Sequence, residues 1–179
     1  RLADEHPDVP DIVIDLANGL VNLSSKQDEQ GVRETIARLE RFADEHPDVP
    51  NIVTALAKGL FNLSSKQEAQ ETITRLERLA DEHPDVPDVV IELAKGLFNL
   101  SVYQDEQGVR ETIACLERLA DEHPDVPDIV IDLANGLVNL SSNQDEQGVR
   151  ETIARLERLA DEHPDMSDII ISLAKELES

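Results

Sequence analysis

The chain has 179 residues and a net charge of -23, because 39 aspartates and glutamates outnumber 16 lysines and arginines. No basic run is present that could neutralise phosphates, and this charge would be repelled by an anionic membrane surface, which argues against nucleic-acid and membrane partners. Its longest apolar runs, such as Ile12–Ile14, are far too short to cross a bilayer. We therefore expect a soluble protein, and we expect it in the cytoplasm.

One unit of sequence recurs along the whole chain. Residues 1–40 and 118–157 differ only where Lys26 is replaced by Asn143. The unit returns at 78–117, at 41–77 with three residues fewer, and as a first half at 158–179. Such a period is typical of a solenoid, so we predict one all-α domain of stacked antiparallel helix hairpins over residues 1–179. Arg1–Asp4 matches the end of a predicted helix, and we therefore expect a fragment of a longer array.

Each unit is predicted to form two amphipathic helices, which the fourth copy illustrates. Apolar residues at three- and four-residue spacing predict a first helix over about 126–141 and a second over about 145–162. The stripe of the first consists of Val130, Leu133, Ala134, Leu137 and Leu140, and that of the second of Val149, Ile153, Leu156, Leu159 and Ala160. In the second copy, the missing residues predict a second helix about one turn shorter.

Short signals predict where these helices begin and end. His163-Pro164 should stop a second helix, because proline disfavours helical geometry in its predecessor, and Asp125 should cap the first helix of its copy. Glycines inside the first helices, Gly19, Gly59, Gly96 and Gly136, predict close approach of a neighbouring helix. In the last helix, Glu176 and Glu178 replace Gly and Phe or Val, which predicts a polar end to the array.

The unit resembles the tetratricopeptide repeat family. The resemblance covers the whole chain and rests on Leu133-Ala134 and Leu137 in the first helix, followed by Ile153, Leu156, Leu159-Ala160 and Pro164. The unit is about six residues longer than that family's repeat, and HEAT and armadillo repeats are the alternative. The resemblance implies a right-handed superhelix whose concave groove, lined by the first helix of each repeat, holds extended peptides.

Differences among the copies fall mainly on one stripe of the first helix, which the resemblance places in that groove. We predict a peptide-binding groove there, with a repeated asparagine able to donate to and accept from a peptide backbone. Its predicted residues are Asn22, Lys58, Phe61, Asn62, Lys95, Phe98, Asn99, Asn135 and Asn139. The central copies combine a cation, an aromatic ring and a carboxamide, so a carboxylate ligand is one option.

The acidic residues around this stripe would steer a basic peptide segment toward it. We therefore expect a protein or peptide partner with a basic stretch, which makes the chain an interaction scaffold. The alternative is a structural spacer or a self-assembling array that associates end to end. A protein whose repeats serve only to provide length would also have near-identical copies.

No catalytic or cofactor site is predicted. Serines cluster in turns without a paired histidine, and Cys115 stands where other copies have arginine, so we expect no enzyme. The five histidines occur once per repeat and cannot converge on one metal ion; we expect them at helix ends and predict no metal and no cofactor.

Overall fold

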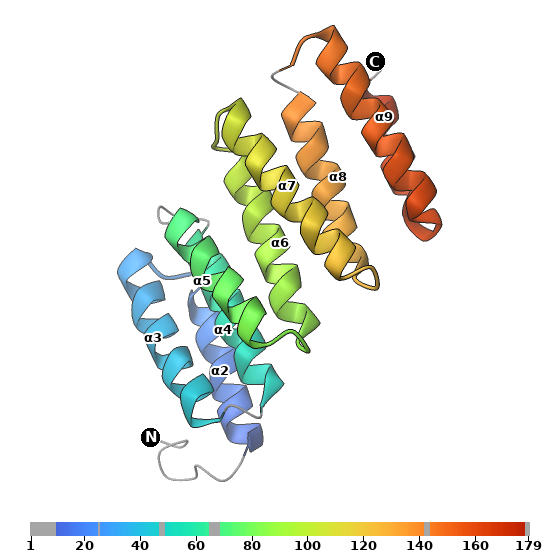
Figure 1. Cartoon of the computed structure of the whole chain (residues 1–179). Helices are drawn as coiled ribbons and strands as arrows, with labels where there is room; N and C mark the ends of the chain where they lie inside the picture. The colour runs from blue at the N-terminus through green and yellow to red at the C-terminus, as the bar shows by residue number, and fades with distance from the viewer. Residues whose placement is uncertain (1–9, 25, 47–48, 65–68, 142–143, 178–179) are drawn as a thin grey trace. The chain divides into compact units, whose positions relative to one another are not determined.

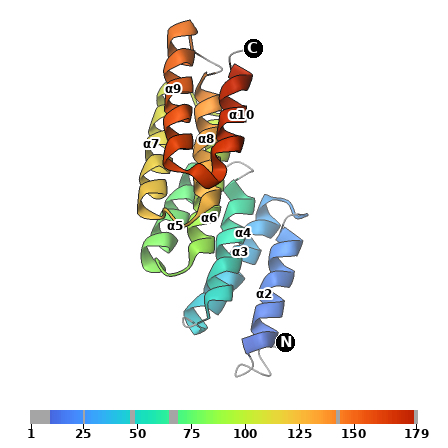
Figure 2. The same ribbon diagram turned by 90° about the vertical axis from the view of Figure 1, so that its right-hand side faces the viewer.

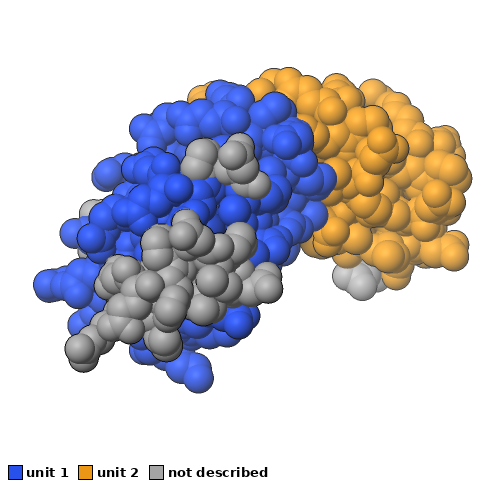
Figure 3. Space-filling model, turned by 90° about the horizontal axis from the view of Figure 1, so that it is seen from below, with its two compact units in different colours: residues 1–96 blue, residues 97–179 orange. Residues whose placement is uncertain are grey.

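The computed structural model describes residues 10–24, 26–46, 49–64, 69–141 and 144–177. Within these ranges every regular element is a helix, which confirms the predicted all-α class. The chain divides into two compact units, Arg1–Gly96 and Leu97–Ser179, and their boundary falls inside one helix (Figure 3). No helix of the described part is both long and apolar enough to cross a membrane.

Unit 1 contains two helix hairpins and the beginning of a third. Its helices are α2 (Pro10–Ser24), α3 (Glu29–Glu45), α4 (Pro50–Ser64), α5 (Ala69–Glu82) and the first part of α6 (Pro87–Ser101) (Figure 1). α2 packs on α3, α3 on α4 and α4 on α5, and the first helices α2 and α4 also contact each other. Ile52 of α4 is fully buried at the centre of a cluster with Ile14, Leu16 and Phe42.

Unit 2 continues the same order of elements. After the end of α6 come α7 (Glu106–Glu122), α8 (Pro127–Ser141), α9 (Glu146–Glu162), a short 3-10 turn at Pro164–Met166 and α10 (Ser167–Leu177). α7 packs on α8, α8 on α9, and α10 lies against both α9 and α8 (Figure 2). The second helices α3, α7 and α9 thus contact the first helix of the repeat that follows each of them.

The predicted apolar stripes form the core. All five residues of the first-helix stripe in the fourth copy are buried, and Leu156, Leu159 and Ala160 of its second helix are buried with them. Helices α8 and α9 begin and end within a residue or two of the predicted limits. α5 has 14 residues where α3, α7 and α9 have 17, which confirms the shorter second helix of the second copy.

Aspartate caps hold the second helices at their start. The carboxylates of Asp28, Asp105 and Asp145 each accept a hydrogen bond of 2.9 Å from the backbone N–H three residues on, that of a glycine. A Cβ at Gly148 would lie 2.8 Å from the Cβ of Gln144, so glycine lets this glutamine fold over the helix start. The prediction of a cap at Asp125 is wrong, because α8 begins at Pro127 and Val126 precedes it.

The second helices end as predicted at the histidines. His46, His123 and His163 are the C-terminal caps of α3, α7 and α9, and their backbone N–H groups donate to the carbonyl oxygens four residues earlier.

The helix glycines were predicted to allow close approach, and this is confirmed at two positions. A Cβ on Gly59 would lie 3.1 Å from Cδ1 of Leu39, and one on Gly136 would lie 3.5 Å from Cδ1 of Leu116. In both cases the approaching leucine comes from the second helix of the preceding repeat. At Gly19 the prediction stays untested, because a Cβ there would meet no described atom within 4 Å and residues 1–9, which precede α2, lie outside the described part.

Helix α10 is covered less completely than its counterpart α8. Ile129 of α8 is fully buried, whereas Ile169, at the same repeat position in α10, is 50% exposed. Ile170 and Ala174 are buried in α10, as Val130 and Ala134 are at the same repeat positions of α8. Ile169 and Ile171 of α10 are exposed, whereas the prediction of a polar end stays untested, because the side chain of Glu176 and the whole of Glu178 lie outside what the structure describes.

Candidate functional site

Consecutive first helices are joined by side-chain hydrogen bonds. In unit 1 the hydroxyl of Thr54 on α4 donates to Oδ2 of Asp88 on α6 at 3.3 Å. In unit 2 the amide Nδ2 of Asn139 on α8 donates to Oγ of Ser101 on α6 at 3.1 Å. The first helices of neighbouring repeats therefore lie side by side within each unit, as a surface built from these helices requires.

The second copy presents a cation, an aromatic ring and a carboxamide on α4. Lys58, Phe61 and Asn62 are three and four residues apart and so share one face of the helix. Lys58 is exposed, while Phe61 and Asn62 are half-buried. Among the residues described, Lys58 has no ion-pair partner, so its charge is available to a ligand. On α2, Asn22 is exposed, although it already has a partner within the fold.

The third copy differs from the second in the state of its lysine. Nζ of Lys95 lies 3.3 Å from Oε1 of Glu92, whose side chain is only 8% exposed. The second copy has the buried Ala55 at this position. The lysines that looked equivalent in sequence are thus a free cation at Lys58 and a largely compensated one at Lys95. Phe98 and Asn99 follow on α6 and are half-buried.

Asn135 and Asn139 on α8 are both half-buried. The bond from Asn139 to Ser101 uses one of the two amide hydrogens, and Ser101 in turn donates to the carbonyl oxygen of Phe98 at 2.7 Å. Asn139 therefore contributes to the joint between two first helices. Its carbonyl oxygen and second amide hydrogen are left for a ligand.

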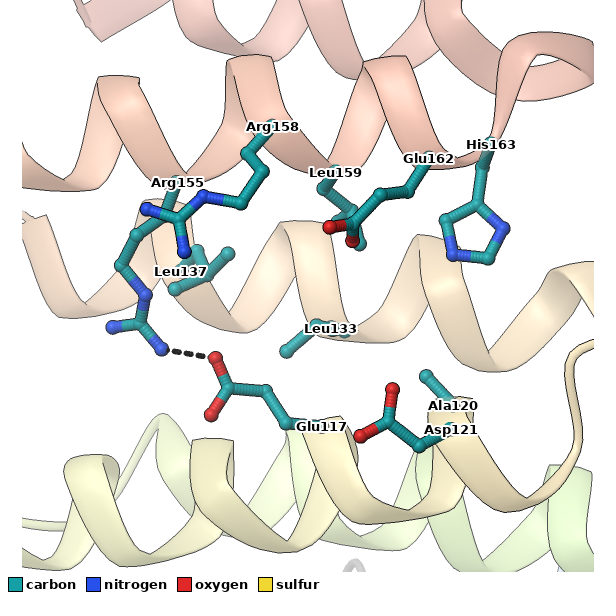
Figure 4. Close-up of a pocket in the computed structure, with 10 residues that line it drawn as sticks. All are labelled: Glu117, Ala120, Asp121, Leu133, Leu137, Arg155, Arg158, Leu159, Glu162 and His163. Atoms are coloured by element: carbon teal, nitrogen blue, oxygen red, sulfur yellow. Dashed lines mark hydrogen bonds and ion pairs between the residues drawn. The ribbon is translucent and has the colours of Figure 1, made fainter.

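The clefts of the structure lie elsewhere. One of about 240 Å³ lies between the second helices α7 and α9, with Leu133 and Leu137 of α8 at its floor (Figure 4). Across it, Arg155 forms an ion pair with Glu117. A related cleft in unit 1, of about 350 Å³, lies beside the equivalent pair of Arg75 and Glu40. None of the nine predicted groove residues lines either cleft.

These two ion pairs were not predicted, although the sequence contains a signal for them. Glu40 and Glu117 occupy the same repeat position, and so do Arg75 and Arg155. A glutamate and an arginine that recur at fixed positions outside the apolar stripe suggest an ion pair between one copy and the next. The half-buried Cys115 takes the arginine position in the third copy, which removes the cation there.

No group of three or more histidine, cysteine, aspartate or glutamate side chains in the described ranges is placed to hold a metal ion. Comparison with known proteins gives no match, whether to family models, to curated sequences or to solved structures. The tetratricopeptide resemblance therefore rests on residue spacing alone.

Proposed function

We propose that the chain is an α-solenoid of the tetratricopeptide type that binds extended peptide segments of a partner protein on the face formed by its first helices. In unit 1 this face belongs to α2, α4 and the first part of α6, and in unit 2 to the rest of α6 and α8. Binding serves assembly and involves no chemical conversion, so the protein acts as a scaffold.

The observation that carries the proposal is the bridging of first helices by Thr54–Asp88 and Asn139–Ser101. Because the sequence repeats, polar side chains recur at equal positions of the first helices, and these bonds bring the helices side by side within each unit. A carboxamide that recurs from helix to helix suits an extended backbone, whose N–H and C=O groups also recur at regular intervals.

Lys58 is the residue on this face best suited to fix the direction of a bound segment. It is an exposed cation without an ion-pair partner in the described part of the chain, beside the aromatic ring of Phe61. An anionic group of the peptide, such as its terminal carboxylate, would pair with Lys58, whereas the surrounding carboxylates favour basic residues further along the segment. Lys95 is a weaker anchor, because Glu92 already compensates its charge.

Single substitutions at the two lysines test this proposal. A set of labelled extended peptides with basic, acidic or neutral residues and a free or amidated C-terminus is titrated with wild type, Lys58→Ala and Lys95→Ala by fluorescence anisotropy. We expect selective binding that Lys58→Ala weakens about tenfold and that Lys95→Ala changes by less. The proposed peptide-binding face would be rejected if both variants bound the peptides as tightly as the wild type. It would also be rejected if the folded wild type bound none of them.

The second candidate is a structural array without a dedicated ligand. The near identity of residues 1–40 and 118–157 favours it, because a surface adapted to one partner needs different side chains in different copies. It predicts that none of the peptides binds.

A further inference from the structure

The flank of α9 that points away from α7 is an incomplete copy of an interface used twice elsewhere in the chain. On α7, Ile113 is 1% exposed and Glu117, one turn later, pairs with Arg155 of the following second helix. On α3, Ile36 is equally buried and Glu40 pairs with Arg75 of the following second helix. Each second helix thus offers an isoleucine and a glutamate, and the next second helix supplies an arginine.

On α9 the same two positions lack this cover. Ile153 is only half-buried and Glu157 is exposed, with no ion-pair partner among the described residues. Both line a groove of about 370 Å³ between α9 and α10, together with Asp161. The opposite wall is formed by Ile171, which is 37% exposed, by the buried Ala174 and by Lys175.

We propose that this groove is a docking site for an amphipathic helix of the same kind as the second helices of this chain. The occupant carries an arginine that pairs with Glu157 and a leucine four residues later that packs on Ile171 and Ala174, as Arg155 and Leu159 are spaced in α9. An ion pair and an apolar contact hold it, as they join α7 to α9, but the apolar partners differ: Leu159 lies with Leu133 and Leu137 of α8, whereas the groove offers Ile171 and Ala174 of α10.

Charge and continuity both support this occupant over others. Glu157 and Asp161 make one wall acidic, so a helix with an acidic or neutral contact face would bury uncompensated carboxylates. Lys175 on the other wall can pair with an acidic side chain that the docked helix carries one turn before its arginine. The second helices have such a residue, since Glu151 lies four residues before Arg155. Glu71 and Arg75 line the cleft of unit 1 with this same spacing.

The test uses a peptide of residues 145–163, which keeps its N-terminal cap Asp145 and its C-terminal cap His163. The labelled peptide is titrated with the full chain by fluorescence anisotropy, and the titration is repeated with Glu157→Arg. We expect saturable binding that Glu157→Arg weakens about tenfold or more, because attraction is replaced by repulsion. A peptide carrying Arg155→Glu should bind the wild type poorly and should bind Glu157→Arg well.

Glu45→Arg is the matched control. Glu45 is an exposed residue of α3 outside the groove, and its replacement changes the net charge by the same amount. It should leave binding unchanged, as should Lys58→Ala, so that this site and the proposed peptide groove are tested separately. Circular dichroism verifies that each variant is folded.

Three outcomes overturn the proposal. They are no saturable binding of the peptide, equal weakening by Glu157→Arg and Glu45→Arg, and failure of the charge-reversed pair to restore affinity. Sedimentation velocity provides a further check: a dimer of the chain that disappears in Glu157→Arg would mean that a second copy, not a separate helix, occupies the groove.

Discussion

Three glycines at one repeat position provide a graded test of how successive hairpins pack. Gly19, Gly59 and Gly136 occupy the same place in α2, α4 and α8. Replacing each by alanine removes the same backbone penalty of roughly 0.5–1 kcal/mol, because glycine loses more conformational freedom in a helix. The three substitutions therefore differ only in what the new methyl group meets.

The structure ranks these environments. At Gly19 the methyl meets nothing within 4 Å, and at Gly136 it makes ordinary contacts of 3.5 Å with Leu116 and 3.7 Å with Ile113. At Gly59 it would lie 3.1 Å from Leu39, which is completely buried and must shift within a packed core. Overpacking of this kind costs about 1–3 kcal/mol, which cancels or exceeds the helical gain.

We expect Gly19→Ala and Gly136→Ala to stabilise the chain and Gly59→Ala to leave it unchanged or less stable. Thermal unfolding followed by circular dichroism measures this, since about 1 kcal/mol corresponds to roughly 2–4 °C in Tm for a chain of this size. Equal stabilisation by all three substitutions would refute the reasoning, because it would mean that Leu39 does not press on α4. Gly19→Leu and Gly59→Leu enlarge the contrast: the first should be tolerated and the second should destabilise strongly.

Two further predictions concern polar contacts and charge. The hydroxyl of Thr112 donates to Oε1 of Gln104 at 2.8 Å, whereas Oγ1 of Thr72 has no hydrogen-bond partner among the described residues. We therefore expect Thr112→Val to lower the free energy of unfolding by about 1 kcal/mol and Thr72→Val to lower it by less, as measured by urea unfolding. A larger loss for Thr72→Val would contradict this expectation. Because the net charge is -23, raising the salt concentration from roughly 0.02 to 0.5 M should raise Tm by screening self-repulsion, and a Tm independent of salt would argue against this.

The fold was largely predictable because the repeat presents each signal several times. Apolar spacing located both helices of the hairpin, and the deletion in the second copy gave the length of α5. The cap at Asp125 was misplaced because aspartates precede and follow Val126-Pro127, and composition alone does not decide which of them begins the helix. Gly19 and Gly59 stand at the same repeat position, yet Leu39 lies close only to Gly59 among the described residues, and this difference is not visible in the repeat sequence.

The candidate site was less predictable, since side-chain partners depend on the next repeat. Lys58 and Lys95 are equivalent in sequence, and only the replacement of Ala55 by Glu92 makes one a free cation and the other a paired one. Asn139 looked like a ligand-binding residue, yet it donates to Ser101 within the fold. The exposure of Ile169 on α10 could not be foreseen, because its counterpart Ile129 is fully buried in α8.

The most direct test of the peptide-binding face is to map where a bound peptide lies. The side-chain amide, aromatic and leucine methyl resonances of the isotope-labelled chain are followed by NMR during titration with the peptide that binds best. We predict that Phe61 and Asn62 of α4 shift together and saturate with one affinity, while the methyl groups of Leu133 and Leu137 stay unchanged. Shifts confined to those leucine methyls, which line the cleft between α7 and α9, would contradict a binding face on the first helices.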